Sequence, residues 1–97
     1  LITVFWRDIP SHIIFKTKSG KFKKQMSPRF EKAIDRAAMR AGKGSSDAYM
    51  ADWRREIVKI KTDDPQSIVD QEIELLEQMF SDDLLEKTVK SKGIKEE

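Results

Sequence analysis

The first 26 residues carry the short apolar runs and turn signals of β-strands. Residues 1–6 (LITVFW) are β-branched and aromatic almost throughout, which favours a strand buried on both faces or central in a small sheet. Residues 12–18 (HIIFKTK) alternate between two faces, and the Ser19-Gly20 turn signal precedes a weaker alternation over residues 21–26. The pattern therefore predicts a short antiparallel β-hairpin or a three-stranded sheet.

From residue 27 onwards, apolar positions recur at the spacing of amphipathic helices. Ser27-Pro28 predicts a helix start, with Ser27 as N-cap and proline at the first helical position, and Gly42 predicts its end. The apolar face of this helix is rich in alanine, so a neighbouring element can approach it closely. Its members are Phe30, Ala33, Ile34, Ala37, Ala38 and Ala41.

Three further helices are predicted by the same reasoning. The second has an apolar stripe that runs from Tyr49 through Trp53 to Ile57 and Ile60, although residues 58–62 also fit an extended conformation. The last helix is short and covers about residues 82–89. The start signals of the three helices are Ser45 or Ser46, Asp64 followed by Pro65, and Ser81.

This order of elements predicts an α+β fold, in which three to four helices pack on one face of the sheet. A chain of 97 residues is long enough for one domain. We expect that domain to span residues 1–89, and residues 90–97 to form a polar, mobile tail.

Charge is segregated along the chain. Residues 1–62 contain 15 lysines and arginines against 6 acidic residues, whereas residues 63–97 contain 4 lysines against 11 acidic residues. The formal net charge of +2 therefore conceals a block of +9 followed by a block of −7. Such blocks indicate either pairing within the molecule or a charged partner.

Composition argues against several classes of function. The chain has no cysteine, so no disulfide or thiolate metal site can form, and we expect a reducing, cytoplasmic location. No apolar run approaches the roughly 20 residues of a membrane span, so we expect no membrane partner. The serines lack a recognisable base arrangement, and the single histidine, His12, has no metal-ligand spacing beside it. We therefore expect no catalytic residue, no metal and no cofactor.

A basic stripe distinguishes the first predicted helix. Its positive side chains fall within an arc of about 80° if the helix extends to its last member. Like charges at this spacing cost about 0.2–0.5 kcal/mol per pair, so the stripe is either a solvated face or a surface that binds an anion. That anion would be an acidic protein, a phosphate backbone or the chain's own acidic helix. The stripe consists of Arg29, Lys32, Arg36, Arg40 and Lys43.

The predicted hairpin is also basic, because residues 16–24 (KTKSGKFKK) place five lysines around one phenylalanine. Basic residues interleaved with an aromatic ring can suit nucleic acid. Lysines at a sheet edge also protect it against aggregation, and the acidic C-terminal third would repel phosphate. Nucleic-acid binding through Lys16–Lys24 and the basic helix is therefore an alternative to a protein partner.

Four polar residues near strand ends and aromatic rings are candidates for a site. Arg7, Asp8 and His12 lie around the predicted break between the first two strands. Arg54 follows Trp53, where a guanidinium can stack on the ring or bridge to a carboxylate. A third hypothesis is that Arg7, Asp8 and His12 complete an enzyme site shared with a partner.

Several segments in combination resemble a known family of short bacterial proteins and domains. They are FWRDIP (5–10), SPRF (27–30), AIDRAAM (33–39), SDAY (46–49) and WRR (53–55). Together they resemble the "virulence factor" domain family over most of residues 2–56. Some members of that family are free-standing proteins of about this size. In others the domain adjoins a module like the N-terminal part of iron–sulfur scaffold proteins and helical repeats. The resemblance implies an accessory role in a larger assembly and assigns no catalytic residue.

We therefore predict a non-enzymatic interaction module of a larger bacterial assembly. It would dock through the basic helix face and the acidic C-terminal helix. Its partner would be another protein, in a multi-subunit complex.

Overall fold

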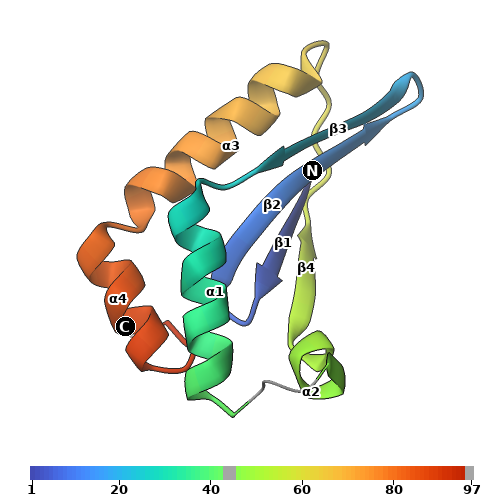
Figure 1. Ribbon diagram of the computed structural model, residues 1–97. Coiled ribbons are helices and arrows are strands. Elements are labelled where there is room, and N and C mark those ends of the chain that lie inside the picture. The colour runs from blue at the N-terminus through green and yellow to red at the C-terminus, as the bar shows by residue number, and fades with distance from the viewer. Residues whose placement is uncertain (43–45, 96–97) are drawn as a thin grey trace.

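The computed structural model describes residues 1–42 and 46–95, and their α+β fold confirms the predicted class (Figure 1). The strands are β1 (Ile2–Trp6), β2 (Ile9–Thr17), β3 (Gly20–Gln25) and β4 (Trp53–Ile57). They form one antiparallel sheet in the order β3-β2-β1-β4. The helices are α1 (Pro28–Arg40), α2 (Ser46–Ala51), α3 (Pro65–Met79) and α4 (Asp82–Lys90).

Strand β1 occupies the centre of the sheet, as its continuous apolar sequence predicts. It pairs with β2 on one side and with β4 on the other, and Val4, Phe5 and Trp6 are all buried. A strand with neighbours on both edges has every ladder hydrogen bond available to it, so burial costs its backbone little.

Strand β4 corrects the sequence interpretation, which continued the second helix through Trp53 and Ile57. Helix α2 ends at Ala51, and the chain becomes extended at Trp53, which pairs with Trp6 of β1. The edge of β1 that β2 leaves open requires hydrogen-bond partners, and residues 53–57 provide them. This tertiary requirement overrides a local apolar spacing that fits a helix.

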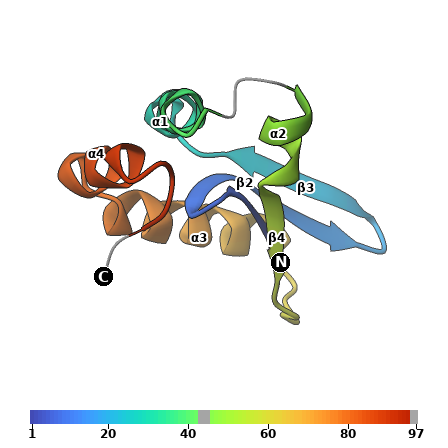
Figure 2. The ribbon, with the colours of Figure 1, turned by 90° about the horizontal axis from the view of Figure 1, so that it is seen from below.

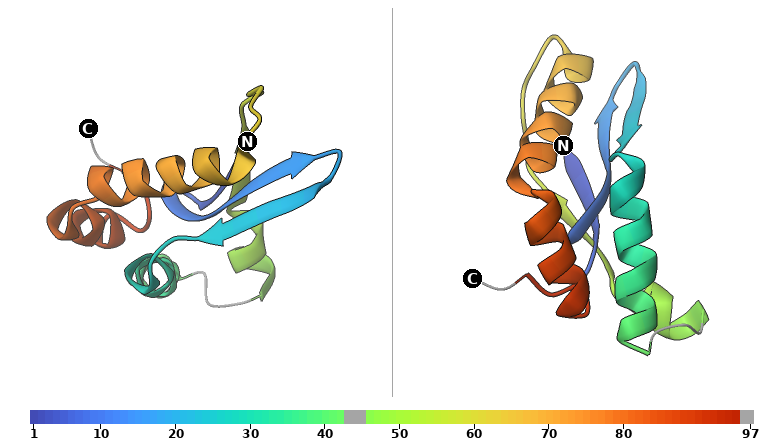
Figure 3. Two further views of the ribbon diagram at one scale, coloured as in Figure 1. Left: turned by 90° about the horizontal axis from the view of Figure 1, so that it is seen from above. Right: turned by 60° about the vertical axis from the view of Figure 1, so that its left-hand side comes forward.

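The helices lie on both faces of the sheet, so the expectation that they cover one face was wrong. Figure 2 shows α1 and α2 on one side of the strands and α3 on the other, and Figure 3 shows the same arrangement from above. Helix α4 lies alongside α1, at the end of the sheet. The charge segments explain part of this placement, because acidic α3 and α4 flank basic α1.

The core forms where β2, α1, α3 and α4 meet. Ile13 and Phe15 of β2, Phe30 of α1 and Val69 of α3 are members of one buried cluster. Small side chains on α1, including Ala37 at 0% exposure, let α4 approach closely. Two predicted caps are confirmed. The Asp64 side chain accepts a hydrogen bond from the Ser67 N–H at 3.2 Å, and the Ser81 hydroxyl accepts one from the Leu84 N–H at 3.1 Å.

The segment after α4, expected to be a mobile tail, contacts the turn between β1 and β2 as far as residue 95. The Asp8 N–H donates to the Gly93 carbonyl at 2.9 Å, and the Lys95 N–H donates to the Asp8 carboxylate at 2.7 Å. Gly93 is buried, with a φ of 90°. The described part of the C-terminal segment is therefore joined to the domain.

Within the described part of the chain, no helix combines the length and apolar character needed to cross a membrane.

Candidate functional site

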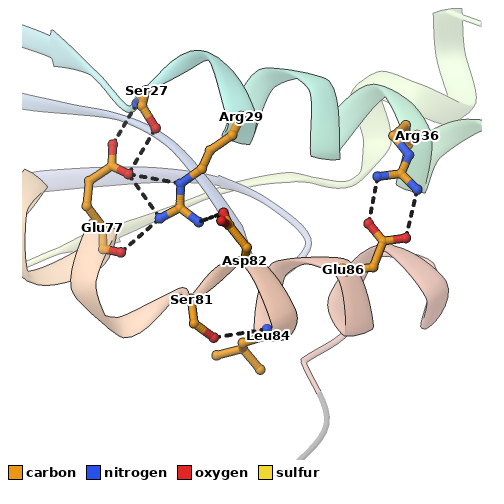
Figure 4. A network of polar contacts seen from close by, with 8 residues as sticks. All are labelled: Ser27, Arg29, Arg36, Glu77, Ser81, Asp82, Leu84 and Glu86. Atoms are coloured by element: carbon orange, nitrogen blue, oxygen red, sulfur yellow. Dashed lines mark hydrogen bonds and ion pairs between the residues drawn. The ribbon is translucent and has the colours of Figure 1, made fainter.

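Arg29, the first residue of the predicted basic stripe, is bound by the acidic end of α3. Its Nη2 lies 3.1 Å from Oε1 of Glu77 and donates to the Glu77 backbone carbonyl at 2.8 Å. Its Nη1 lies 3.1 Å from Oδ1 of Asp82, at the start of α4 (Figure 4). The guanidinium also lies over the Phe30 ring, 4.6 Å from the centroid. Arg29 therefore fastens α1 to the junction of α3 and α4.

Glu77 also closes the N-terminus of α1. We expected the Ser27 side chain to cap this helix, but it makes no capping bond. The Ser27 N–H and hydroxyl instead donate to the Glu77 carboxylate at 2.8 and 2.9 Å. Burial raises the pKa of Glu77, but the hydrogen bonds from Ser27 and Arg29 outweigh burial, and the net pKa is lowered. Glu77 is therefore a charged carboxylate at the positive end of a helix dipole.

The rest of the stripe contains both paired and unpaired side chains. Arg36 forms a bidentate ion pair with Glu86 of α4, with nitrogen–oxygen distances of 2.7 and 2.8 Å (Figure 4). The hydrogen bonds of this pair raise the pKa of Arg36 and lower the pKa of Glu86. Lys32 and Arg40 have no ion-pair partner among the residues that the structure describes, and Lys43 lies outside them. The chain's own acidic helices thus bind two of the five residues of the stripe, Arg29 and Arg36.

Three of the four candidate polar residues meet at the β1–β2 turn, where they join parts of the fold. The Arg54 Nε donates to the Arg7 carbonyl at 2.7 Å, and its Nη2 lies 3.2 Å from Oδ1 of Asp8. The second Asp8 oxygen accepts from the Lys95 N–H, and Arg7 Nη1 donates to the Lys92 carbonyl at 2.8 Å. These bonds connect the turn with β4 and the C-terminal segment. Arg7, Asp8 and Arg54 therefore have a structural role.

His12 lies apart from those three residues. It pairs with Val4, which also pairs with Arg55, so His12 and Arg55 share the face of the sheet opposite to Arg54. The β1–β2 register shifts at this point, which makes Ser11 an extra residue in β2. The Ser11 hydroxyl is 3.1 Å from Nδ1 of His12.

The part of this face beyond α1 and α2 carries exposed basic side chains and no acidic residue; we call it the open sheet face. Strand register brings together residues from both hairpin strands, from β1 and from β4. The lysines, Arg55 and Ile57 are exposed, whereas Val4 and Ile14 are buried. The open sheet face consists of Ile2, Val4, His12, Ile14, Lys16, Lys21, Lys23, Gln25, Arg55 and Ile57.

The positive charge of the open sheet face affects the pKa of its histidine, His12. Burial lowers the pKa of His12, and the nearby charges of Lys23, Arg55 and Lys21 lower it further. No aspartate or glutamate occupies a register position on this face. One hairpin lysine, Lys24, does not lie on the open sheet face: it points to the opposite face and forms an ion pair with Asp70 of α3 at 2.9 Å. The open sheet face therefore has a charge that no group of its own offsets.

Arg55 is the residue that the sequence interpretation missed. The helix that we predicted through residues 46–57 would separate Arg55 from the hairpin. Strand β4 instead places Arg55 in one row with Val4 and His12. The signal that could have found it is the alternation of Trp53, Arg55 and Ile57 with Arg54 and Glu56.

These features define a small α+β domain with internally paired helices and one uncompensated basic surface. The chain belongs to the virulence factor family, whose model matches residues 4–89. This match confirms the resemblance inferred from the WRDIP, AIDRAAM and WRR segments. No curated protein and no solved structure matches the chain.

Proposed function

We propose that this domain is a non-enzymatic interaction module that docks the open sheet face onto an acidic surface of another protein. One observation carries the proposal: Lys21, Lys23 and Arg55 converge on one exposed face that contains no acidic residue. The acidic groups of α3 and α4 that form ion pairs bind α1 and β3, so these pairs do not neutralise this face. An acidic partner would supply the missing charge.

The proposal moves the docking surface from the basic helix to the sheet. Two arginines of the stripe, Arg29 and Arg36, are bound by Glu77, Asp82 and Glu86. A partner at that place would have to displace these ion pairs. Among the residues that the structure describes, the lysines of the open sheet face have no ion-pair partner; Lys24, which pairs with Asp70, lies on the other face.

A protein surface fits the open sheet face better than nucleic acid does. Exposed Ile57 and half-buried Ile2 interleave with the basic side chains, and apolar anchors of this kind supply affinity at protein interfaces. Binding of single-stranded nucleic acid relies on aromatic stacking, and the open sheet face holds no phenylalanine, tyrosine or tryptophan.

The hypothesis of a shared enzyme site has less support. Arg7 and Asp8 are engaged in bonds that hold the β1–β2 turn, and His12 lies on the other face of the sheet from Arg54. An accessory module of a larger assembly remains our proposal for the biological setting, and it rests on the likeness to the virulence factor family.

The proposal can be tested with a fluorescent peptide of alternating glutamate and isoleucine, compared with single- and double-stranded oligonucleotides of equal charge. We expect the peptide to bind more tightly than either oligonucleotide, and its affinity to fall with salt. The variant Lys21→Glu/Lys23→Glu should weaken peptide binding by about tenfold or more.

The matched control is Lys32→Glu/Arg40→Glu, which makes the same change in charge on the helix stripe. It should leave peptide binding nearly unchanged. Loss of binding in this control instead would assign docking to the helix, and tighter binding of an oligonucleotide would favour the nucleic-acid alternative. Either result, or no peptide binding at all, would overturn the proposal.

A further inference from the structure

A cavity of about 240 Å³ lies between α1, α2 and the sheet. Its lining residues on α1 and α2 place it on the side of the strands away from α3, and Figure 2 shows these two helices on that side. Its volume is below the range of sites for drug-sized ligands, so it suits a single side chain or a small ion. The polar and aromatic side chains that line it are Ser11, Gln25, Glu31, Asp35, Tyr49 and Trp53.

The aromatic side chains that line this cavity are held in place by contacts with each other and with Trp6. Tyr49 and Trp53 meet edge to face, with ring centroids 5.7 Å apart. Trp6, which is completely buried, stacks on Tyr49 at 6.0 Å and donates from Nε1 to the Tyr49 carbonyl at 3.0 Å. The rings therefore form a pre-organised surface rather than a mobile one.

The α1 side of the cavity carries two carboxylates on exposed residues. Glu31 and Asp35 lie one helical turn apart on α1, and neither has a hydrogen bond or ion pair among the described residues. Burial raises the pKa of Tyr49, and the charges of Asp35 and Glu31 raise it further, so both carboxylates act on its phenol. Like charges at this spacing destabilise a helix. Glu31 gains from its place in the first turn, but Asp35, one turn further on, does not.

We propose that this cavity binds a guanidinium group, such as the end of an arginine side chain. A guanidinium is planar, stacks on aromatic rings and binds carboxylates through several N–H groups at once. Tyr49 and Trp53 provide the rings, and Glu31 and Asp35 provide the acceptors. The oxygens of Ser11 and Gln25 add further acceptors at the rim.

The side chains that line the cavity favour a guanidinium over a metal ion and over a quaternary ammonium group. A metal ion would need at least one more ligand, and the described residues hold no group of three histidine, cysteine or acidic side chains able to bind one. A quaternary ammonium group has no N–H to donate to the carboxylates, and it is best held by several aromatic faces. Two rings and two carboxylates suit a planar donor better.

This inference does not depend on the proposed docking of the open sheet face. The cavity is acidic and the open sheet face is basic, so they select opposite charges. If both bind the same protein, an arginine next to an acidic patch would mark that partner.

The test is titration of the protein with methylguanidinium chloride at constant ionic strength, followed by tryptophan fluorescence and by amide NMR signals of residues 49–53. Saturable binding is expected, with a dissociation constant on the order of 1 mM. N-methylurea has the same shape without the charge and should not bind. Tetramethylammonium should bind at least about threefold more weakly than methylguanidinium.

The variant Glu31→Gln/Asp35→Asn should weaken methylguanidinium binding by at least about tenfold. Its thermal stability should change little, because the repulsion that it removes offsets the helix-dipole interaction that Glu31 loses. It should also lower the pKa of Tyr49, the single tyrosine. Glu74→Gln/Asp83→Asn removes two charges from α3 and α4 and should leave both readouts unchanged. Equal binding of N-methylurea, tighter binding of tetramethylammonium, or unchanged binding in the Glu31/Asp35 variant would each overturn the proposal.

Discussion

Arg29 and Glu77 are separated by 48 positions in the sequence, and their side chains lie 3.1 Å apart in the fold. The contact joins the basic block of the chain to the acidic block at the point where three helices meet. It shows that the block of +9 and the block of −7 pair within the molecule. It also means that much of the predicted basic stripe contributes to the fold.

The Arg29–Glu77 pair should contribute measurably to stability. In a double-mutant cycle with Arg29→Ala and Glu77→Ala, we expect a coupling free energy of about 1–2 kcal/mol, because the pair is partly buried and includes several charge-assisted hydrogen bonds. Chemical denaturation of the four proteins gives the value. The cycle for Arg36 and Glu86, whose ion pair is exposed, should give a smaller coupling. Equal couplings would contradict the part assigned to Glu77.

Stability should fall in acid through Glu77. Its folded pKa is lowered from the ordinary value of 4.5, so the folded state keeps this carboxylate charged at a pH where the unfolded chain takes up a proton. The stabilisation is complete above pH 4.5 and is lost as the pH falls through the lowered value. Thermal melts from pH 6 to pH 2 should therefore fall less steeply for Glu77→Gln than for the wild type. Glu74→Gln, on the same helix, should keep the wild-type slope.

His12 reports the charge of the open sheet face. Its pKa, lowered by burial and by Lys23, Arg55 and Lys21, should rise in the variant Lys23→Gln. NMR titration of the single histidine measures this directly. Lys18→Gln is the matched control and should leave the His12 pKa unchanged, because Lys18 is not among the charges that lower it. An unmoved pKa in Lys23→Gln would mean that the lysine lies too far from the ring.

The lowered pKa of His12 also predicts how the stability of the domain depends on pH. Neutral His12 is favoured in the folded state, so its contribution to stability is present above the ordinary value of 6.5 and is lost as the pH falls through the folded pKa. His12→Gln should therefore reduce the loss of stability that occurs just below pH 6.5. Binding of an acidic peptide should raise the His12 pKa, which links this measurement to the proposed docking surface.

Gly93 should tolerate no side chain. A Cβ at this position would lie 2.7 Å from the ring of buried Trp6, and the φ of 90° is unfavourable for any L-residue with a side chain. We expect Gly93→Ala to destabilise the domain by about 2–4 kcal/mol. Gly42→Ala is the matched control: its φ is also positive, at 71°, but nothing lies within 4 Å, and the cost should be about 1 kcal/mol. Similar costs for the two would show that the C-terminal segment is not packed on Trp6.

The elements that local signals specify were predictable from the sequence. Proline at the first helical position, after a polar residue, located the starts of α1 and α3, and Ser81 as N-cap located the start of α4. The hairpin of β2 and β3 followed from alternation around Ser19-Gly20. These signals are local, because a cap or a turn satisfies its own backbone within a few residues.

The segment from Trp53 to Ile57 was not predictable in the same way. Its spacing fits one face of a helix and also the alternation of a strand, so periodicity alone does not decide. The free edge of β1 decides, because its N–H and C=O groups need partners that residues 53–57 can supply. The location of Arg55 beside the hairpin lysines depends on this choice.

The sequence by itself determined the α+β class, three of the helix starts, the hairpin and the segregation of charge. The tertiary structure decided which charges pair, which face of the sheet stays open and which side chains enclose the cavity beside Tyr49. The physical reason is distance along the chain. Caps and turns are settled between neighbours, whereas pairing of Arg29 with Glu77, or of Trp6 with Trp53, requires segments that only the complete fold brings together.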